Sequence, residues 1–325
     1  MSQNEESNPG TLPASTGTNL PVDVHPAVAP RWHTFVLIVA LLLFSWLGAK
    51  GALKGEQPPN SNDHSAQSSG AHASKGITAN STKDAVNSTA MSSNSRMLTY
   101  GTTLIFELIL LGWVWLGMRL QQIPFQVLLG DRSYGWLRNI AIAALFWILA
   151  LIVLSSCGIG WLVAEKEIHS FGHPEHHSSL FGTKENSDAY ADKKSPLPDE
   201  KSSTEKPPQT VLRLAPTNVI ECLFWLLLSV TAGFCEEIIF RGYLQRQLSN
   251  IFGKAAIGAG LSAICFGLSH GYEGARTMFL ITIFGALFSV LALRMRSLKP
   301  GMIAHAWHDL LTGYTIAALK AAGVF

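Results

Sequence analysis

Long apolar runs alternate with long polar stretches along this chain of 325 residues. Most runs approach the length that a transmembrane helix needs, and charged residues or tryptophan stand near their ends, as in many membrane helices. The pattern predicts an all-α, polytopic integral membrane helix bundle. About seven spans are expected, at 35–49, 97–118, 140–163, 219–240, 255–270, 278–293 and 302–319.

The polar stretches divide the chain into parts with different expected roles. Segments with few large apolar side chains cannot bury enough surface to offset the entropy of ordering. The parts are a disordered tail (1–30), a first transmembrane anchor (31–49), a flexible polar linker (50–96), two transmembrane helices (97–163), a polar, histidine-rich insertion (164–212) and a compact core (213–325). The small residues Gly48 and Ala49 also fit a cleaved signal peptide, but the long, weakly charged tail favours an uncleaved anchor.

Charge and cysteine usage narrow the class of protein. A formal net charge of +2 is spread along the chain without a basic patch, so nucleic acid is not an expected partner. Lys and Arg gather in alternate short loops, at 119–138, 241–254 and 294–299, which favours a cytoplasmic N-terminus. The expected location is the plasma membrane. The cysteines fall within predicted spans and are interpreted as packing residues: Cys157, Cys222, Cys235 and Cys265.

Three polar groups of residues interrupt the apolar runs in the last third of the chain. Each has a structural explanation when taken alone, as a helix end, an interfacial histidine or a satisfied buried histidine. Ionisable groups at bilayer depth are costly unless they are paired or used, so the three groups together indicate a functional site. They are Glu236-Glu237-x-x-x-Arg241, Phe266-x-x-x-His270 and His305-x-x-x-Asp309.

Helix geometry divides the two glutamates between two roles. Glu237 and Arg241 lie four residues apart and share a face, so the guanidinium can keep Glu237 ionised, whereas Glu236 points about 100° away. Two nearby carboxylates in a dry site make one of them easier to protonate, which suits a general acid or base. On the last helix, His305 shares a face with Asp309, and His308 can join that face.

The expected depths of these groups do not agree. Counting along the helices places His270 near the outer end of its span, whereas Glu236 and His305 lie nearer the inner side. Either the fourth helix continues past Arg241 to about Leu248, which places Glu236 deeper, or the fifth segment is tilted or broken.

The three motifs, in this order and in apolar helices, resemble those of the CAAX-protease and bacteriocin-processing family. That family, also called CPBP or Abi, includes the Rce1-type prenyl-protein endopeptidases and the lysostaphin-resistance protein A group. The resemblance covers about residues 214–314, and the phrase Lys-Pro-Gly-Met-Ile-Ala-His at 299–305 resembles the family's usual start of its last motif helix.

The resemblance implies a C-terminal CPBP-type core that acts as a glutamate-dependent intramembrane endopeptidase on membrane-associated or lipidated C-terminal peptides. Its implied catalytic residues are Glu236, Glu237, Arg241, His270, His305 and Asp309. By this analogy Glu236 activates water with help from His270, and the last two residues hold the oxyanion. The expected partners are a peptide or membrane-protein substrate and the lipid bilayer. An ionised Asp309 cannot donate a hydrogen bond, so it is either protonated or orients His305.

Other interpretations remain open on the sequence. The favoured mechanism requires no cofactor, but Glu236, His270 and His305 could bind zinc, and the family has often been called metalloprotease. The helix motif His-Glu-x-x-His, which would support zinc, is absent. Alternative functions are a catalytically silent scaffold, an immunity or regulatory protein, or a proton- or ion-coupled transporter.

Two further features of the sequence receive no catalytic role. The histidines around 169–177 are interpreted as a solvated insertion, since short histidine tracts are weak evidence for a metal site. Glu107 lies within an apolar run and is expected to pair with Ser, Thr or Arg on a neighbouring helix.

Overall fold

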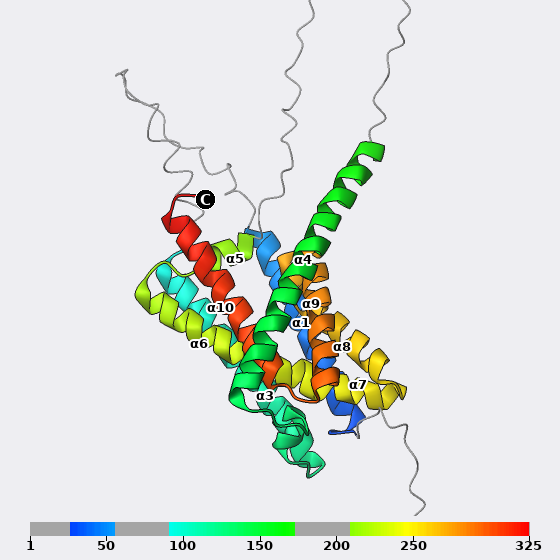
Figure 1. The fold of residues 1–325 in the computed structure, drawn as a ribbon. Helices are drawn as coiled ribbons and strands as arrows, with labels where there is room; N and C mark the ends of the chain where they lie inside the picture. The colour runs from blue at the N-terminus through cyan, green and yellow to red at the C-terminus, as the bar shows by residue number, and fades with distance from the viewer. Residues whose placement is uncertain (1–26, 56–90, 173–208, 325) are drawn as a thin grey trace, which may run out of the picture.

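The computed structural model describes residues 27–55, 91–172 and 209–324 (Figure 1). These residues form helices and no strand, which confirms the predicted all-α class. The elements are α1 (Arg31–Gly55), α3 (Ser93–Leu120), η1 (Phe125–Leu129), α4 (Trp136–Gly172), α5 (Gln209–Leu214), α6 (Val219–Glu236), η2 (Glu237–Leu244), α7 (Gln245–Phe252), α8 (Ala255–Ser269), η3 (Gly271–Glu273), α9 (Ala275–Met295) and α10 (Lys299–Ala321). Most of the predicted tail, linker and insertion lies outside the described residues.

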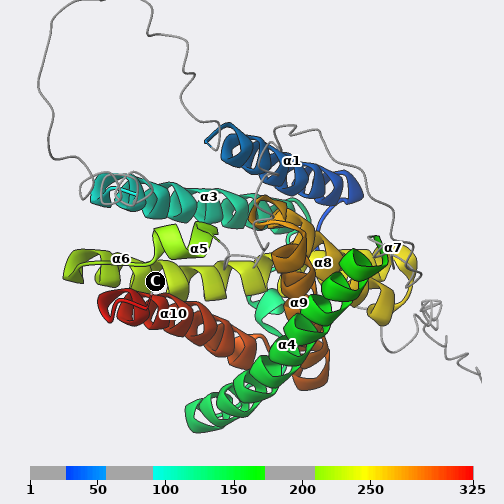
Figure 2. The same ribbon diagram turned by 90° about the horizontal axis from the view of Figure 1, so that it is seen from above.

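Two sets of helices pack against each other. In the first set α3 packs on α6 and α6 on α10, and in the second α8 packs on α9 and on α7. Helix α4 contacts both α10 and α9, while α1 contacts α8 and η3 (Figure 2). The C-terminal half of α4 extends beyond the other helices, past the end expected at residue 163 (Figure 1).

Among the residues that the structure describes, five helical segments are long and apolar enough to cross a membrane. They are Arg31–Lys50, Ser93–Leu120, Trp136–Ile168, Val219–Phe252 and Ala275–Met295. Helix α8 is apolar but has only 15 residues, and α10 is not among the five because polar residues such as His305 and Asp309 lower its hydropathy. The prediction of a polytopic membrane bundle is confirmed, but the expected count of about seven spans is not reached by length and composition.

The fourth predicted span, 219–240, is the first part of one continuous helix of 34 residues, Val219–Phe252. Its middle, η2, is a π-helix, and the amide of Gln245 accordingly donates to the carbonyl five residues back, on Phe240. All eight residues of η2 are buried. The expected continuation of the fourth helix past Arg241 is therefore confirmed, while the depth of Glu236 stays a prediction.

The start of α1 is fixed to this π-helical region by side-chain hydrogen bonds. Tyr243 Oη lies 2.7 Å from His33 Nδ1 and 3.1 Å from Thr34 Oγ1. The Gln247 amide donates to Thr34 Oγ1 at 2.8 Å and to the Ala29 carbonyl at 2.7 Å. Because these groups are buried together, each hydrogen bond is made in a medium where an unpaired group would be costly.

Helices α6 and α10 approach each other closely at Gly233. A Cβ atom at this position would lie 2.7 Å from the Ala306 amide nitrogen and 2.9 Å from the Met302 carbonyl oxygen. Small residues allow such close helix contacts in membrane proteins. One residue before Ala306 stands His305, so this contact sets the distance between the glutamates of α6–η2 and the histidine of α10.

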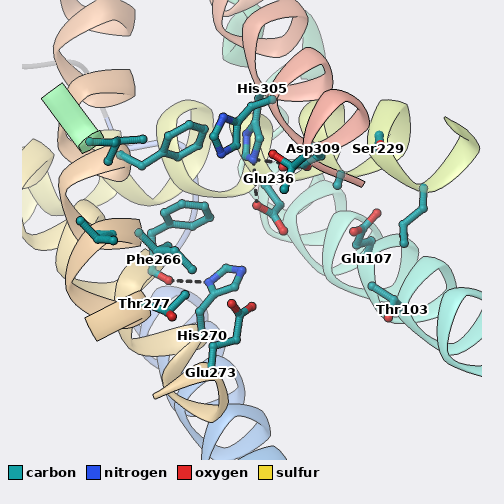
Figure 3. Close-up of a pocket in the computed structure, with 18 of the residues that line it drawn as sticks. Thr103, Glu107, Ser229, Glu236, Phe266, His270, Glu273, Thr277, His305 and Asp309 are labelled. Carbon is teal, nitrogen blue, oxygen red and sulfur yellow. Dashed lines mark hydrogen bonds and ion pairs between the residues drawn. The ribbon is translucent and has the colours of Figure 1, made fainter. Parts of the chain in front are cut away.

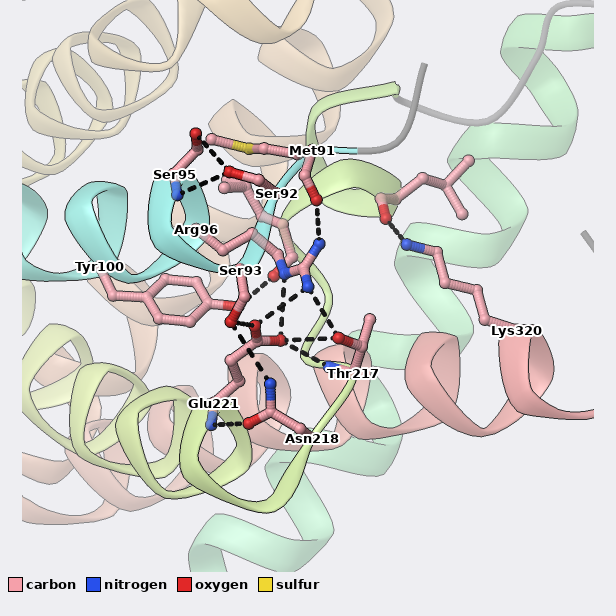
Figure 4. A network of polar contacts seen from close by, with 12 residues as sticks. Met91, Ser92, Ser93, Ser95, Arg96, Tyr100, Thr217, Asn218, Glu221 and Lys320 are labelled. Carbon is pink, nitrogen blue, oxygen red and sulfur yellow. Dashed lines mark hydrogen bonds and ion pairs between the residues drawn. The ribbon is translucent and has the colours of Figure 1, made fainter. Parts of the chain in front are cut away.

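A buried ion pair joins the N-terminal ends of α3 and α6 (Figure 4). Arg96 Nε and Nη2 each lie 3.0 Å from an oxygen of Glu221. The Glu221 carboxylate also accepts hydrogen bonds from the Thr217 amide and hydroxyl, and the Ser93 hydroxyl donates to it. Such a fully paired carboxylate is stable only while its partners remain, because an isolated buried charge is strongly unfavourable.

We expect Gly233→Ala to lower the free energy of unfolding by about 1–3 kcal/mol, because the added methyl group must separate α6 from α10. Gly101→Ala in α3 is the matched control, since no atom lies within 4 Å of its new Cβ. There the substitution should be neutral or stabilise the helix by up to about 1 kcal/mol. Thermal unfolding of the detergent-solubilised variants measures both, and equal midpoints would contradict the close contact.

We expect Arg96→Met to lower the free energy of unfolding by about 3–5 kcal/mol, because it leaves the Glu221 carboxylate buried without its cation. The double variant Arg96→Met/Glu221→Leu should recover much of this loss. Arg119→Met, on the exposed end of the same helix, is the control for removing an arginine. A double variant as unstable as the single one would show that the unpaired charge is not the cause.

Candidate active site

One cavity of about 540 Å³ lies between α3, α6, α8, α9 and α10. Its lining includes Glu236, His270, His305 and Asp309, four of the six predicted catalytic residues (Figure 3). The other two, Glu237 and Arg241, lie behind the cavity wall. The helices thus bring the three separate sequence motifs to one place.

Glu237, Arg241 and His305 form a buried chain of charged groups. Arg241 Nη1 lies 2.9 Å from Glu237 Oε1, and His305 Nδ1 lies 3.1 Å from the same oxygen. The expected pairing of Glu237 with Arg241 is therefore present. A carboxylate held by a guanidinium accepts hydrogen bonds, so His305 carries a proton on Nδ1 and turns Nε2 toward the cavity.

The Arg241 guanidinium is enclosed by aromatic rings and backbone. It lies 4.5 Å from the centre of the Phe266 ring and 5.4 Å from that of Phe288, and Nη2 donates to the Gly285 carbonyl at 3.3 Å. On the other side of the pair, a Cβ on Gly301 would lie 3.1 Å from Glu237 Oε2. These contacts hold the ion pair in place. The aromatic rings and the carbonyl group also compensate for the loss of water around the cation.

The two adjacent glutamates differ sharply in exposure. The side chain of Glu237 is 1% exposed, whereas that of Glu236 is 20% exposed and faces the cavity. His305 Nε2 lies 3.5 Å from Glu236 Oε2 and 3.8 Å from Asp309 Oδ2. One imidazole therefore faces two carboxyl groups that line the cavity.

His270 enters the cavity from the end of α8. Its Nδ1 lies 2.9 Å from the Phe266 carbonyl oxygen, which can only accept, so the proton is on Nδ1. The Nε2 atom of the neutral ring is then the one with a free lone pair. Within the described residues no hydrogen bond or ion pair joins His270 directly to Glu236, and Figure 3 shows the two side chains projecting into the same space from different helices.

The cavity also contains ionisable residues to which the sequence interpretation gave no role. Glu107 of α3 lines the wall and is only 5% exposed, and its Oε2 atom has no hydrogen-bond partner. The expected pairing of Glu107 with Ser, Thr or Arg is not observed for that atom. In the sequence, Glu107 was recognisable only as a single glutamate inside an apolar run, with no motif around it.

Glu273 and His308 complete the ionisable lining. Glu273 follows His270 by three residues in η3, outside the apolar helices, and burial raises its pKa above that of an exposed glutamate. His308 shares the cavity face of α10 with His305, as its spacing indicated, and the centre of its ring lies 4.8 Å from that of Phe284, with the two rings tilted.

Metal ligands are not grouped in the part of the chain that the structure describes. There, no set of three or more His, Cys, Asp or Glu side chains is arranged to hold an ion, and the trio Glu236, His270 and His305 forms no such set. Of the histidine-rich insertion, residues 173–177 lie outside the described residues. Independence from a metal stays a prediction.

Comparison with known families agrees with this geometry. Residues 218–311 match the family model described as type II CAAX prenyl endopeptidase Rce1-like. No curated protein and no solved structure matches the chain. The matched segment begins at the residue that caps α6, Asn218, and contains all six predicted catalytic residues. Over these residues, the C-terminal part of this membrane protein is therefore similar to the Rce1-like family.

Proposed function

We propose that the protein is an intramembrane endopeptidase that hydrolyses peptide bonds with water activated by Glu236. The observation that carries the proposal is the difference between the paired glutamates. Glu237 is buried and neutralised by Arg241, while Glu236 is open to a cavity that also contains two histidines and an aspartate. A packed helix interface would have no need of the second carboxylate.

The residues support a general-base mechanism. A water molecule between Glu236 and His270 would lose a proton to the Glu236 carboxylate, and the hydroxide would attack the scissile carbonyl carbon. The lone pair on His270 Nε2 is available to accept a hydrogen bond from this water and so to orient it. The proton taken by Glu236 would pass to the amide nitrogen as the C–N bond breaks, which yields a carboxylic acid and an amine.

The developing oxyanion would be held from α10. His305 donates from Nδ1 to Glu237, so a second proton on Nε2 makes it a cationic donor aimed at the cavity. Asp309 lies 3.8 Å from the same Nε2 atom. It can stabilise the imidazolium when ionised, or donate to the oxyanion when protonated. The Glu237–Arg241 pair would fix the position of His305 without touching the substrate.

The substrate class follows from the position of the site. The lining is mainly apolar and lies within a helix bundle suited to the bilayer, so membrane-associated or lipidated C-terminal peptides are the proposed substrates. The distribution of Lys and Arg supports a cytoplasmic N-terminus, with the plasma membrane as the proposed location.

We expect the purified protein to cleave members of a quenched fluorescent peptide library, prepared in prenylated and unmodified forms. Glu236→Gln should lower turnover by about 10²–10⁴-fold, because the amide cannot accept the proton. Glu165→Gln is the matched control, since Glu165 stands eleven residues beyond the cavity-lining Leu154 on α4. Turnover that is unchanged in Glu236→Gln would refute the assignment, and turnover lost on adding a strong chelator would assign the activation of water to a metal.

We expect Asp309→Asn and Asp309→Leu to behave differently. The asparagine amide can donate a hydrogen bond at the same place, so Asp309→Asn should keep measurable turnover. Asp309→Leu removes the polar group and should lower kcat by about 10²–10³-fold, the usual effect of losing one oxyanion donor. Equal turnover in the two variants would show that residue 309 does not contribute through a hydrogen bond.

A further inference from the structure

The charges that line the cavity are unbalanced. Its described lining contains no lysine or arginine, although it contains three histidines. The carboxyl groups that face it come from Glu107, Glu236, Glu273 and Asp309. The proposed chemistry uses Glu236 and Asp309, and Glu273 lies in η3 on the side of His270 (Figure 3). Glu107 is the remaining acid, and neither the matched family segment nor the proposed mechanism gives it a role.

Glu107 is buried without the partners that a buried carboxylate normally has. It is 5% exposed, and its Oε2 atom has no hydrogen-bond partner among the described residues. By contrast, the buried Glu221 accepts hydrogen bonds from an arginine, a threonine and a serine. A carboxylate at membrane depth without a cation is unfavourable by several kcal/mol, so a group of a bound substrate is expected to supply the missing partner.

The neighbouring hydroxyl groups on the same wall can only accept. Thr103 Oγ1 donates to the Thr99 carbonyl at 2.9 Å, and Ser229 Oγ donates to the Trp225 carbonyl at 2.8 Å. Each hydroxyl has one proton, so toward the cavity both present oxygen lone pairs. Figure 3 shows Thr103, Glu107 and Ser229 together on one side of the cavity, away from His270 and Glu273. This wall therefore offers two hydroxyl oxygens and one carboxyl group, and it carries no basic side chain.

We propose that Thr103, Glu107 and Ser229 form a subsite for the basic side chain of a lysine or arginine in the substrate peptide. An ammonium group has three donors and a guanidinium has five, which match a wall of acceptors around one carboxylate. The proposal rests on the proposed peptidase function and extends it: residues of α3 and Ser229 of α6 select the substrate, while Glu236 at the end of α6 cleaves it together with residues of α8 and α10. The basic residue would lie a few positions from the scissile bond, because the subsite and Glu236 share one cavity.

The test is a positional scan with matched peptides. Lysine is placed at each position of a cleavable host peptide in turn and compared with norleucine at the same position, and kcat/KM is measured for each pair. At one position the wild-type protein should prefer lysine by about tenfold or more, and Glu107→Gln should reduce this ratio to about one. Thr103→Val, which keeps the shape of the side chain, should reduce the ratio partially, and Glu165→Gln should preserve it. A ratio near one at every position in the wild type, or a ratio unchanged in Glu107→Gln, overturns the proposal.

A binding measurement separates this proposal from the proposed function. Fluorescence anisotropy compares labelled lysine and norleucine peptides on the wild type and on Glu107→Gln, without need of turnover. If no peptide is cleaved but the lysine peptide binds more tightly to the wild type alone, the subsite stands and the peptidase assignment fails. If peptides are cleaved but lysine brings no advantage in binding or turnover, the subsite fails and the peptidase stands. If the two peptides bind equally, or neither binds, and no peptide is cleaved, both proposals fail.

Discussion

The ion pair between Glu237 and Arg241 is the constraint on which the site depends. Two charges with almost no exposure to solvent are tolerated only if every nearby element supplies compensation. Here α9 supplies a backbone carbonyl and the Phe288 ring, α8 supplies the Phe266 ring, and α10 supplies His305. The pair therefore joins the helices that carry the three motifs, and of the two glutamates it leaves Glu236 as the one that lines the cavity.

Much of this arrangement could be predicted from the sequence, for reasons that particular residues make clear. Residues four apart on a helix share a face, so the partners Glu237 and Arg241 were predictable from spacing alone. The common contact of His305 with both glutamates was not, because it depends on how closely α6 and α10 approach at Gly233. The π-helical turn of η2 was not predictable either, since one widened turn leaves no recognisable period in the hydrophobic pattern.

The end of α4 and the surroundings of Glu107 differ from expectation, because an apolar run indicates neither the end of a helix nor its tertiary contacts. The apolar run of α4 ends near residue 163, but the helix continues to Gly172 through residues such as Ala164, Glu165 and Lys166, which favour a helix in water. The end of an apolar run thus does not mark the end of the helix. Glu107 was recognisable in the sequence as a charged residue within an apolar run. Whether a neighbouring helix supplies a partner for it depends on tertiary packing, which the sequence does not show.

Helix α1 touches the site-bearing segment at two separated points. Near its start it holds Tyr243 in η2, and further along Ser45 Oγ accepts a hydrogen bond from the Gly271 amide, next to His270. Helix α1 thereby connects the α6–η2 helix, which carries Glu236, to the end of α8, where His270 lies. Helix α3 forms one wall of the cavity. Neither helix belongs to the segment that identifies the family. The segment that matches the family model is therefore smaller than the unit that forms the site. A fragment limited to residues 218–311 would keep every motif residue, but it would lose the contacts of α1 and the cavity wall formed by α3.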